Sequence, residues 1–292
     1  MSIDSIRTVA VLGAGTMGNG IAHVFARAGY KVLLRDVEQR FLDRAVDTIA
    51  QNLDREIKRG KLELAEKARV LERVLPVTDM STLANADFVV EAVPEKFEIK
   101  RHVLTEADHL VRDDVIIASN TSSIAITTLA AMTKRPERFV GMHFMNPVPV
   151  MVLVEVIRAL QTSDMTFATT MQLAERLGKK PVAVNDAPGF VSNRVLMPLI
   201  NEAAYCVMEG VATAEAVDAV MKTGMNHPMG PLELADFIGL DVCVDIMNVL
   251  LEGLGDPKYR ACPLLKKYVA AGWLGRKSSR GFYSYDNKGA LK

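Results

Sequence analysis

One histidine in this sequence lies at a position where it could act as a general acid or base. His143 lies in the segment GMHFMNP directly after a strand-like run, and Glu155 interrupts an apolar run twelve residues later. Histidine titrates near neutral pH, so it suits proton exchange with a hydroxyl group. If the two runs are neighbouring strands, the Glu155 carboxylate can meet the ring of His143 and stabilise its protonated form. A glutamate at a sheet edge facing solvent is the alternative. For the other histidines we expect surface or cap positions.

A glycine-rich segment near the N-terminus indicates a dinucleotide site. VLGAGTMGNGIA places Gly13, Gly15 and Gly18 between a strand-like run and a helical pattern, and Asp36 ends the next strand-like run. These are the contexts that the G-x-G-x-x-G fingerprint requires. The glycines permit a tight turn, approach of the backbone to a pyrophosphate, and close packing of a helix whose first N–H groups bind phosphate. Asp36 can accept hydrogen bonds from ribose hydroxyls and repels a 2′-phosphate. NAD is therefore the expected cofactor and NADP the less favoured one, because two nearby arginines soften the preference.

Two further polar clusters lie at positions where a ligand could bind. The hydroxyl-rich turn 119–123 follows a strand-like run, and its alternative role is to cap a helix that begins near Ile124. The segment 186–194 lies at a predicted domain junction, where the Asn193 amide could close onto a ligand. An ordinary position at a helix start is equally compatible with Asn193.

The elements that must position these residues follow from the apolar patterns. Strand-like runs alternate with helical patterns through the first part of the chain, which predicts a Rossmann-type, mainly parallel sheet covered by helices. A helical hairpin turning near Gly60 is expected at about residues 38–74. The predicted strands are Thr8–Leu12, Lys31–Arg35, Phe88–Glu91, Val115–Ala118, Phe139–Met142, Val152–Ile157 and Pro181–Val184.

The character of the sequence changes at Pro188-Gly189, where helical patterns replace strand-like runs. We therefore predict an α/β dinucleotide-binding domain over residues 1–186 and a smaller all-α domain over residues 187–292. Five methionines on the second domain's predicted helices are interpreted as core residues, with a dimer surface as the alternative. The predicted helices are Asn201–Glu209, Ala214–Thr223, Ile238–Leu254 and Leu264–Ala271.

The composition narrows the class of protein. Among the 292 residues, 35 basic and 35 acidic side chains balance, so no nucleic-acid partner is expected. The three cysteines are widely spaced, and no metal site is expected. Apolar runs are too short for a membrane helix, and the N-terminus does not resemble a signal peptide. The expected location is the cytoplasm, without a membrane partner.

Taken together, these segments resemble the 3-hydroxyacyl-CoA dehydrogenase family, and in particular its bacterial members that act on 3-hydroxybutyryl-CoA. The resemblance covers essentially the full chain, with seven blocks in the same order. The terminal block departs from the family's pattern just before Gly281. The blocks are VLGAGTMGNGIA, EAVPE, SNTSSI, HFMNPVPVM, NDAPGFVSNR, HPMGPLELADFIGLD and GRKSSRGFY.

The resemblance implies hydride transfer between NAD and the 3-position of a 3-hydroxyacyl-CoA, so that the substrate is an acyl-CoA. We also expect a homodimer formed through the helical domain. The resemblance implies that His143 and Glu155 form the catalytic pair, while Ser122 and Asn193 bind substrate oxygens. A dehydrogenase of a free hydroxy acid or sugar acid such as gulonate, and a non-catalytic dinucleotide-binding protein, are the alternatives. Further cofactor contacts are expected from Thr16, Met17, Glu95, Lys100, Ser122, Asn146 and Lys277, and coenzyme A contacts from Arg55, Lys58 and Arg59.

Overall fold

The computed structural model describes residues 3–286 and 289–292. The chain divides into two compact units, Met1–Ala187 and Pro188–Lys292. The division lies one residue after the boundary expected from the Pro-Gly pair. Each unit has a hydrophobic core of its own.

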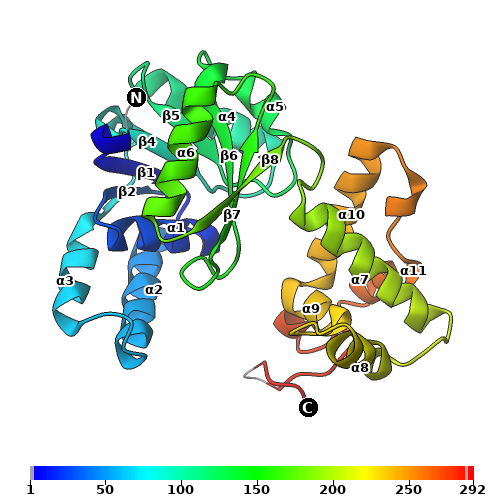
Figure 1. Ribbon diagram of the computed structural model, residues 1–292. Helices are drawn as coiled ribbons and strands as arrows, with labels where there is room; N and C mark the ends of the chain where they lie inside the picture. The colour runs from blue at the N-terminus through cyan, green and yellow to red at the C-terminus, as the bar shows by residue number, and fades with distance from the viewer. Residues whose placement is uncertain (1–2, 287–288) are drawn as a thin grey trace. The chain divides into compact units, whose positions relative to one another are not determined.

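The first unit is built on an 8-stranded sheet with the order β3-β2-β1-β4-β5-β6-β7-β8 (Figure 1). β7 runs antiparallel to β6, and the other neighbouring pairs are parallel. The central strands are buried apolar runs, as expected where helices cover both faces of a parallel sheet. This confirms the predicted fold class. The strands are β1 (Thr8–Leu12), β2 (Lys31–Arg35), β3 (Val74–Val77), β4 (Phe88–Glu91), β5 (Ile116–Ser119), β6 (Phe139–Phe144), β7 (Leu153–Arg158) and β8 (Lys180–Asn185).

Strand β3 is absent from the sequence prediction. It is a short edge strand that contains Pro76, and it begins at Val74, where the predicted helical hairpin ends. Proline lacks a backbone N–H and is tolerated at the edge of a sheet, where one side of the strand is not paired. β3 pairs only with β2 in the strand order, so Pro76 occupies such a position.

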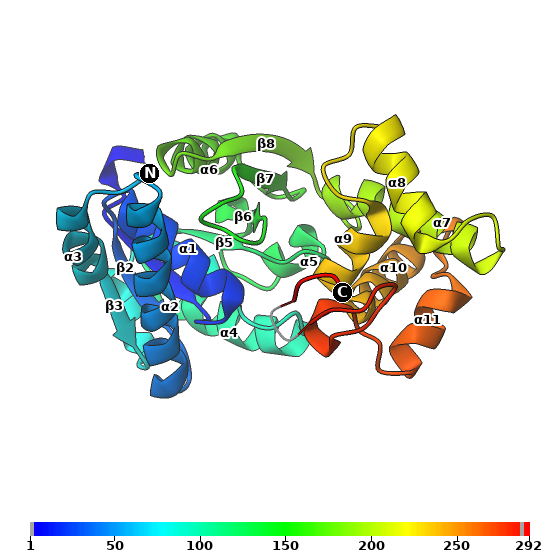
Figure 2. The same cartoon turned by 90° about the horizontal axis from the view of Figure 1, so that it is seen from below.

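Helices cover both faces of this sheet. The largest apolar core lies between the sheet and residues of α1 (Thr16–Arg27), α2 (Gln39–Lys58) and α6 (Asp164–Arg176). Figure 2 shows the strands between α6 on one side and α4 (Phe97–Leu110) on the other. The short helix α5 (Ile126–Ala130) packs against β6.

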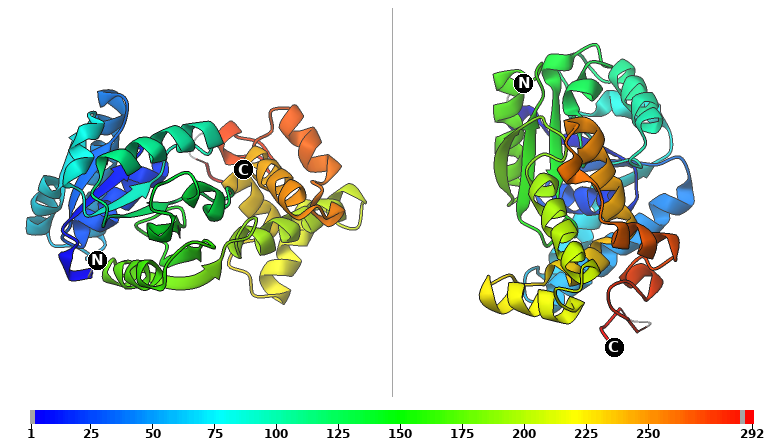
Figure 3. Two further views of the ribbon diagram at one scale, coloured as in Figure 1. Left: turned by 90° about the horizontal axis from the view of Figure 1, so that it is seen from above. Right: turned by 90° about the vertical axis from the view of Figure 1, so that its right-hand side faces the viewer.

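A helical pair lies beside the β2–β3 edge (Figures 1 and 3). It consists of α2 and α3 (Leu64–Arg73), and Gly60 lies between them with a φ of 66°. This left-handed conformation favours glycine because a Cβ is disfavoured there. The hairpin expected at about residues 38–74 is therefore present as two helices.

The second unit is helical, with a core formed by buried residues from its helices. Its first helix begins at Ser192, nine residues before the predicted start, because the helix continues through Pro198. A proline inside a helix removes one backbone hydrogen bond, which is why the pattern placed the start after it. A further helix, α9, is absent from the prediction. The helices are α7 (Ser192–Met208), α8 (Ala214–Gly224), α9 (Pro231–Ile238), α10 (Leu240–Leu254) and α11 (Pro263–Ala270).

The methionines of this unit occupy different environments. Met247 is 1% exposed and lies in the core, whereas Met208 and Met225 are 40% and 62% exposed. Met221 and Met229 are half-buried. The interpretation as core residues therefore holds for Met247 and is wrong for Met208 and Met225.

The terminal block packs onto α9 through Asp236. This side chain is 1% exposed and accepts hydrogen bonds from the Phe282 and Tyr283 N–H groups and from the Tyr285 hydroxyl. Gly281 lies so close that a Cβ there would stand 1.9 Å from Asp236 Oδ1. The Gly-Phe-Tyr part of the block is therefore required by packing within the second unit.

Candidate active site

The glycine segment forms the turn between β1 and α1. Gly13 has a φ of 100°, and a Cβ there would lie 2.6 Å from the Ala92 carbonyl oxygen. A Cβ on Gly18 would lie 1.7 Å from the Gly13 carbonyl oxygen, so the first turn of α1 packs directly on the turn. At Gly15, by contrast, a Cβ would meet nothing within 4 Å. The backbone at Gly15 is therefore open to a large ligand, and the N-cap glycine has no side chain that could accept from the first N–H groups of α1.

Asp36 lies beside this turn, at the end of β2. Its Oδ2 accepts a hydrogen bond from the Ala14 N–H at 2.6 Å, and its Oδ1 accepts from the Val37 N–H at 2.7 Å. The carboxylate is partly exposed. An acidic acceptor next to an open helix N-terminus fits the ribose and the pyrophosphate of NAD. Thr16 and Met17 form the first turn of α1 at the same place.

His143 and Glu155 face each other on neighbouring strands. They are direct partners in the antiparallel register of β6 and β7, and His143 Nδ1 lies 2.8 Å from Glu155 Oε2. Both side chains are buried, at 8% and 2% exposed. A carboxylate accepts hydrogen bonds, so it fixes the proton of the neutral ring on Nδ1. Nε2 is then the nitrogen of that ring that can accept a proton. The contact that the spacing alone left open is present.

Ser122 lies in a turn that is held by Glu95. Glu95 Oε1 accepts hydrogen bonds from the Ser122 and Ser123 N–H groups at 3.0 and 3.1 Å, from Ser123 Oγ at 2.8 Å, and from Thr121 Oγ1. Burial raises the pKa of Glu95, but the charge of Lys100 and the hydroxyl donors outweigh it and hold this pKa below its usual value. Glu95 therefore remains a carboxylate and organises the turn that carries Ser122.

Asn120 joins this turn to the strand of His143. Its Oδ1 accepts a hydrogen bond from the Phe144 N–H at 2.9 Å, one residue beyond His143. The last paired residues of β5 and β6 are Ser119 and Gly141, so the Asn120 side chain continues the connection past the end of the ladder. The alternative role of the turn at 119–123, as the cap of the next helix, is not the one observed for α5, because the Asp186 carboxylate accepts from the Ile126 and Thr127 N–H groups.

The remaining predicted residues occupy varied positions. Asn146 is exposed and precedes a cis bond to Pro147. Lys100 is buried, at 1% exposed. Three basic residues are exposed at the C-terminal end of α2, where helix-dipole stabilisation of positive charge is an ordinary structural role: Arg55, Lys58 and Arg59.

Two predicted residues belong to the second unit. Asn193 lies in the first turn of α7, after a turn in which Gly189 and Phe190 have positive φ values. The Lys277 ammonium lies 2.6 Å from the Asp241 carboxylate. Ser122, His143 and Glu155 all belong to the first unit.

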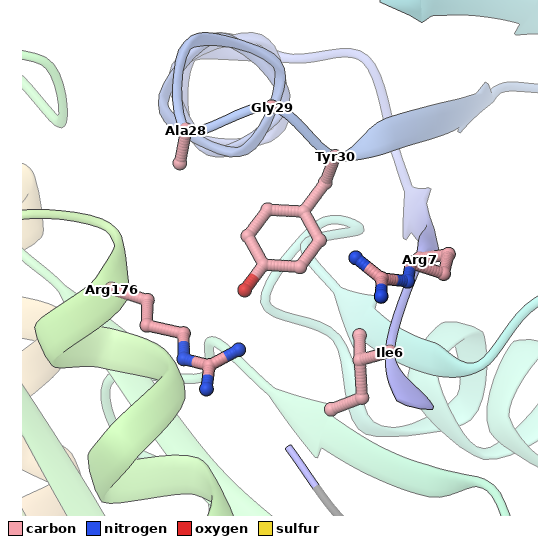
Figure 4. Close-up of a pocket in the computed structure, with 6 residues that line it drawn as sticks. All are labelled: Ile6, Arg7, Ala28, Gly29, Tyr30 and Arg176. Carbon is pink, nitrogen blue, oxygen red and sulfur yellow. The ribbon is translucent and has the colours of Figure 1, made fainter. Parts of the chain in front are cut away.

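A separate pocket of about 280 Å³ lies at the other end of the sheet (Figure 4). It is lined by Arg7, which precedes β1, and by Tyr30 and Arg176. Figure 4 shows the two guanidinium groups and the Tyr30 hydroxyl pointing into the same space. The Arg176 guanidinium is paired with Asp4. Because the glycine turn follows β1 whereas Arg7 precedes it, this pocket does not belong to the dinucleotide site.

The described residues hold no group of three or more His, Cys, Asp or Glu side chains that could bind a metal ion. In the same residues, no helix is both long and apolar enough to span a membrane.

Comparison with known proteins agrees with this geometry. Residues 8–187 match the family model described as 3-hydroxyacyl-CoA dehydrogenase, NAD binding domain, and residues 189–285 match its C-terminal domain. The chain belongs to the 3-hydroxyacyl-CoA dehydrogenase family. Within this family, it is 54% identical to a probable 3-hydroxybutyryl-CoA dehydrogenase of Bacillus subtilis, over 97% of this chain and 99% of that one. It is 56% identical to the corresponding probable enzyme of Deinococcus radiodurans, over 94% and 99% of the two chains.

A solved structure of the same family has the same fold. The (S)-3-hydroxybutyryl-CoA dehydrogenase PaaH1 of Ralstonia eutropha superposes with a TM-score of 0.94 at 52% identity, over 97% of this chain and 100% of that chain. These findings confirm the predicted family resemblance and the assignment of an NAD-binding dehydrogenase domain to the first unit.

Sequence reasoning did not assign a role to Glu91, and it treated Ser119 only as part of the hydroxyl-rich turn. Glu91, at the end of β4, is 0% exposed and contacts Lys100, and Ser119 on the neighbouring strand β5 donates to it. The available signal was an acidic residue that ends the apolar run FVVE. A charge in that position needs a buried partner.

Proposed function

We propose that this chain interconverts (S)-3-hydroxybutyryl-CoA and acetoacetyl-CoA by hydride transfer to and from NAD. The observation that carries the proposal is the buried contact between His143 and Glu155, in the sheet whose β1–α1 turn is open at Gly15. The named activity of relatives that match nearly the full chain supports the substrate. A binding module would need the glycine turn alone.

The proton moves through His143. In the oxidation direction, Nε2 of the neutral ring accepts the proton of the 3-hydroxyl group as the hydride leaves C3, and the ring becomes an imidazolium. Glu155 accepts from Nδ1–H and stabilises that charge. NAD supplies the acceptor for the hydride. In the reduction direction, the same Nε2 returns the proton to the 3-keto oxygen.

Two polar side chains orient the substrate. Ser122, on the turn held by Glu95, donates a hydrogen bond near the reacting oxygen, and Asn193 donates near the thioester. Fixed donors of this kind position the reacting carbon and stabilise developing charge. The exposed cations at the end of α2 bind the phosphates of coenzyme A: Arg55, Lys58 and Arg59.

The cofactor is NAD in preference to NADP. Asp36 lies 2.6 Å from the Ala14 N–H of the glycine turn, where a 2′-phosphate would meet its negative charge. Gly13, Gly15, Thr16, Met17 and Gly18 form the pyrophosphate cradle. Asn146 and Lys277 contribute further cofactor contacts. The chain acts in the cytoplasm as a homodimer formed through the helical unit, where Met208 and Met225 are exposed.

Replacement of His143 tests the proposed base. His143→Gln keeps a hydrogen-bonding side chain but cannot carry the proton, so kcat for acetoacetyl-CoA with NADH should fall by about 10²-fold or more. His102→Gln is the matched control, because the His102 side chain is 80% exposed. NADH binding, measured by fluorescence titration, should be unchanged in both variants. A His143→Gln enzyme within severalfold of the parent rate would show that the base is misassigned.

Substrate and cofactor comparisons test the rest. Rates with acetoacetyl-CoA and longer 3-ketoacyl-CoA thioesters should far exceed rates with free acetoacetate and gulonate, and NADH should be used at least about tenfold better than NADPH. Preference for a free acid would favour the hydroxy-acid alternative. An inactive chain that still binds NADH would favour the non-catalytic alternative.

A further inference from the structure

Lys100 is a lysine whose three donors are all used inside the protein. Its ammonium lies near the start of α4 and is 1% exposed. Nζ contacts Glu91 Oε1 at 2.7 Å, Glu95 Oε2 at 3.1 Å and the Val93 carbonyl oxygen at 3.2 Å. A lysine ammonium has three N–H donors and no acceptor. The ammonium is therefore held by three acceptors that belong to the segment between residues 91 and 95.

Glu91 anchors this ammonium to the sheet. Its Oε1 accepts from Lys100 and from the Val93 N–H at 2.7 Å, and its Oε2 accepts from Ser119 Oγ at 2.6 Å. Glu91 and Ser119 are direct partners in the register of β4 and β5. Burial raises the pKa of Glu91, and the charge of Lys100 opposes that rise. Glu91 thus holds Lys100 from two neighbouring strands.

Glu95 carries the connection onward to the turn at 121–123. One of its oxygens faces Lys100, and the other accepts the four hydrogen bonds that come from the turn. The Ser122 N–H is one of those four donors, at 3.0 Å. Unbroken contacts therefore run from Glu91 through Lys100 and Glu95 to the backbone of Ser122.

We propose that Glu91 and Lys100 are positioning residues, which act through Glu95 to hold the Ser122 turn. The importance of that turn to catalysis rests on the proposed function, whereas the positioning itself does not. The two carboxylate oxygens of Glu95 have different partners. Oε2 contacts the buried Lys100 ammonium, and Oε1 accepts the hydrogen bonds from the turn. Removal of the ammonium lets the Glu95 side chain move, and the turn loosens with it.

The test measures the turn directly, in the full chain without NADH. Amide hydrogen exchange at Ser122 and Ser123 reports whether their N–H groups remain bonded to Glu95. Lys100→Met removes the ammonium and keeps a linear side chain, and the double variant Glu91→Gln/Lys100→Met also removes the unpaired charge that the single change would bury. Both variants should raise exchange at these two amides by about tenfold. Lys96→Met is the matched control, because Lys96 is an exposed lysine four residues earlier, and it should change nothing.

A second readout separates positioning from cofactor binding. Glu91→Gln leaves Lys100 its charge, so a lysine that served as a ligand would still bind NADH in that variant. We expect Glu91→Gln to raise exchange in the same two amides and to lower kcat with acetoacetyl-CoA by about tenfold, and the double variant to lose less than the product of the two single losses. Unchanged exchange in the Lys100→Met and double variants, with NADH affinity reduced tenfold or more, would overturn the proposal.

The design keeps the two proposals apart and does not depend on one variant. If the parent protein fails to reduce acetoacetyl-CoA, the proposed function fails, while the exchange measurement still decides the positioning. If the Lys100 variants do not fold, Thr121→Val cuts one bond between the turn and Glu95 without touching the buried charges. The Thr121 hydroxyl also accepts from the Ser123 and Ile124 N–H groups, so the readout is Ser122 alone. Exchange there should rise by about threefold, and no change at Ser122 would count against the proposal.

Discussion

Glu91 in the first unit and Asp236 in the second are both buried carboxylates, but the protein compensates them in different ways. Glu91 has the Lys100 ammonium at 2.7 Å, whereas Asp236 accepts from two backbone N–H groups and the Tyr285 hydroxyl. Burial raises the pKa of both carboxyl groups. The Lys100 charge opposite Glu91 connects it to a second carboxylate, Glu95. The neutral N–H and O–H donors opposite Asp236 connect it only to the terminal block. The type of partner therefore distinguishes Glu91, which stabilises the candidate active site, from Asp236, which fixes the C-terminal segment.

Removal of each carboxylate should produce the largest effects, in different places. Glu91→Ala leaves a buried ammonium with one carboxylate fewer, and such losses cost about 3–5 kcal/mol. Asp236→Ala leaves three donors without their acceptor, at about 1–3 kcal/mol each. Hydrogen exchange should show opening at residues 119–124 in the first variant and at residues 275–285 in the second. Faster exchange in both regions in either variant would contradict the claim that each carboxylate stabilises only its own region.

Removal of a single hydroxyl donor gives a smaller and more direct comparison. Tyr285→Phe deletes the hydroxyl that donates to Asp236, and Ser119→Ala deletes the one that donates to Glu91. A neutral donor contributes about 1 kcal/mol. We expect Tyr285→Phe to cost more, because the charge of Lys100 still stabilises Glu91 after its hydroxyl is lost. Denaturant unfolding followed separately for each unit measures both values, and equal costs would weaken the comparison.

The smallest expected effect is a dependence of stability on pH in the second unit. Burial, helped by the nearby Asp218 charge, raises the pKa of folded Asp236 above the ordinary aspartate value of 3.8. The folded state therefore binds this proton more tightly than the unfolded state does, so the stabilisation is fully present at low pH. It is lost as pH rises from the unfolded pKa through the folded one. Asp236→Asn should flatten this slope, measured by exchange at residues 275–285 between about pH 4 and 7, and an unchanged slope would assign the dependence to another group.

Much of this fold follows from local patterns. The strands around the glycine turn are apolar, and the turn itself needs glycine for steric reasons that operate within a few residues, as the contact between Gly18 and the Gly13 carbonyl shows. The sequence prediction failed at two prolines, where the surrounding structure tolerates a residue that usually ends a strand or a helix. β3 forms through Pro76 because an edge position tolerates proline, and α7 continues through Pro198.

The site was less accessible to sequence reasoning. Nothing local to Lys100 indicates that it is buried, because its environment depends on Glu91, nine residues earlier on β4, and on the turn after β5. Within the terminal block, the sequence indicated a role for Lys277 alone, and the closeness of Gly281 to Asp236 became visible only when α9 and the terminal block lay together. Side chains whose partners lie on other elements therefore need the structure.

The pairing of β6 with β7 has a consequence for how this protein can change over generations. His143 and Glu155 are opposite each other because of strand register, and β7 is also fixed on its other side, where Glu155 pairs with Val182 of β8. A slip by one residue would turn either side chain to the opposite face of the sheet. The connecting loop at 145–152 is fixed as well, because Val148 is buried in the core and the Lys179 ammonium donates to the Val148 and Met151 carbonyl oxygens. Change in that loop is therefore least constrained at exposed positions such as Val150, while the proton carrier and its carboxylate are inherited as a pair.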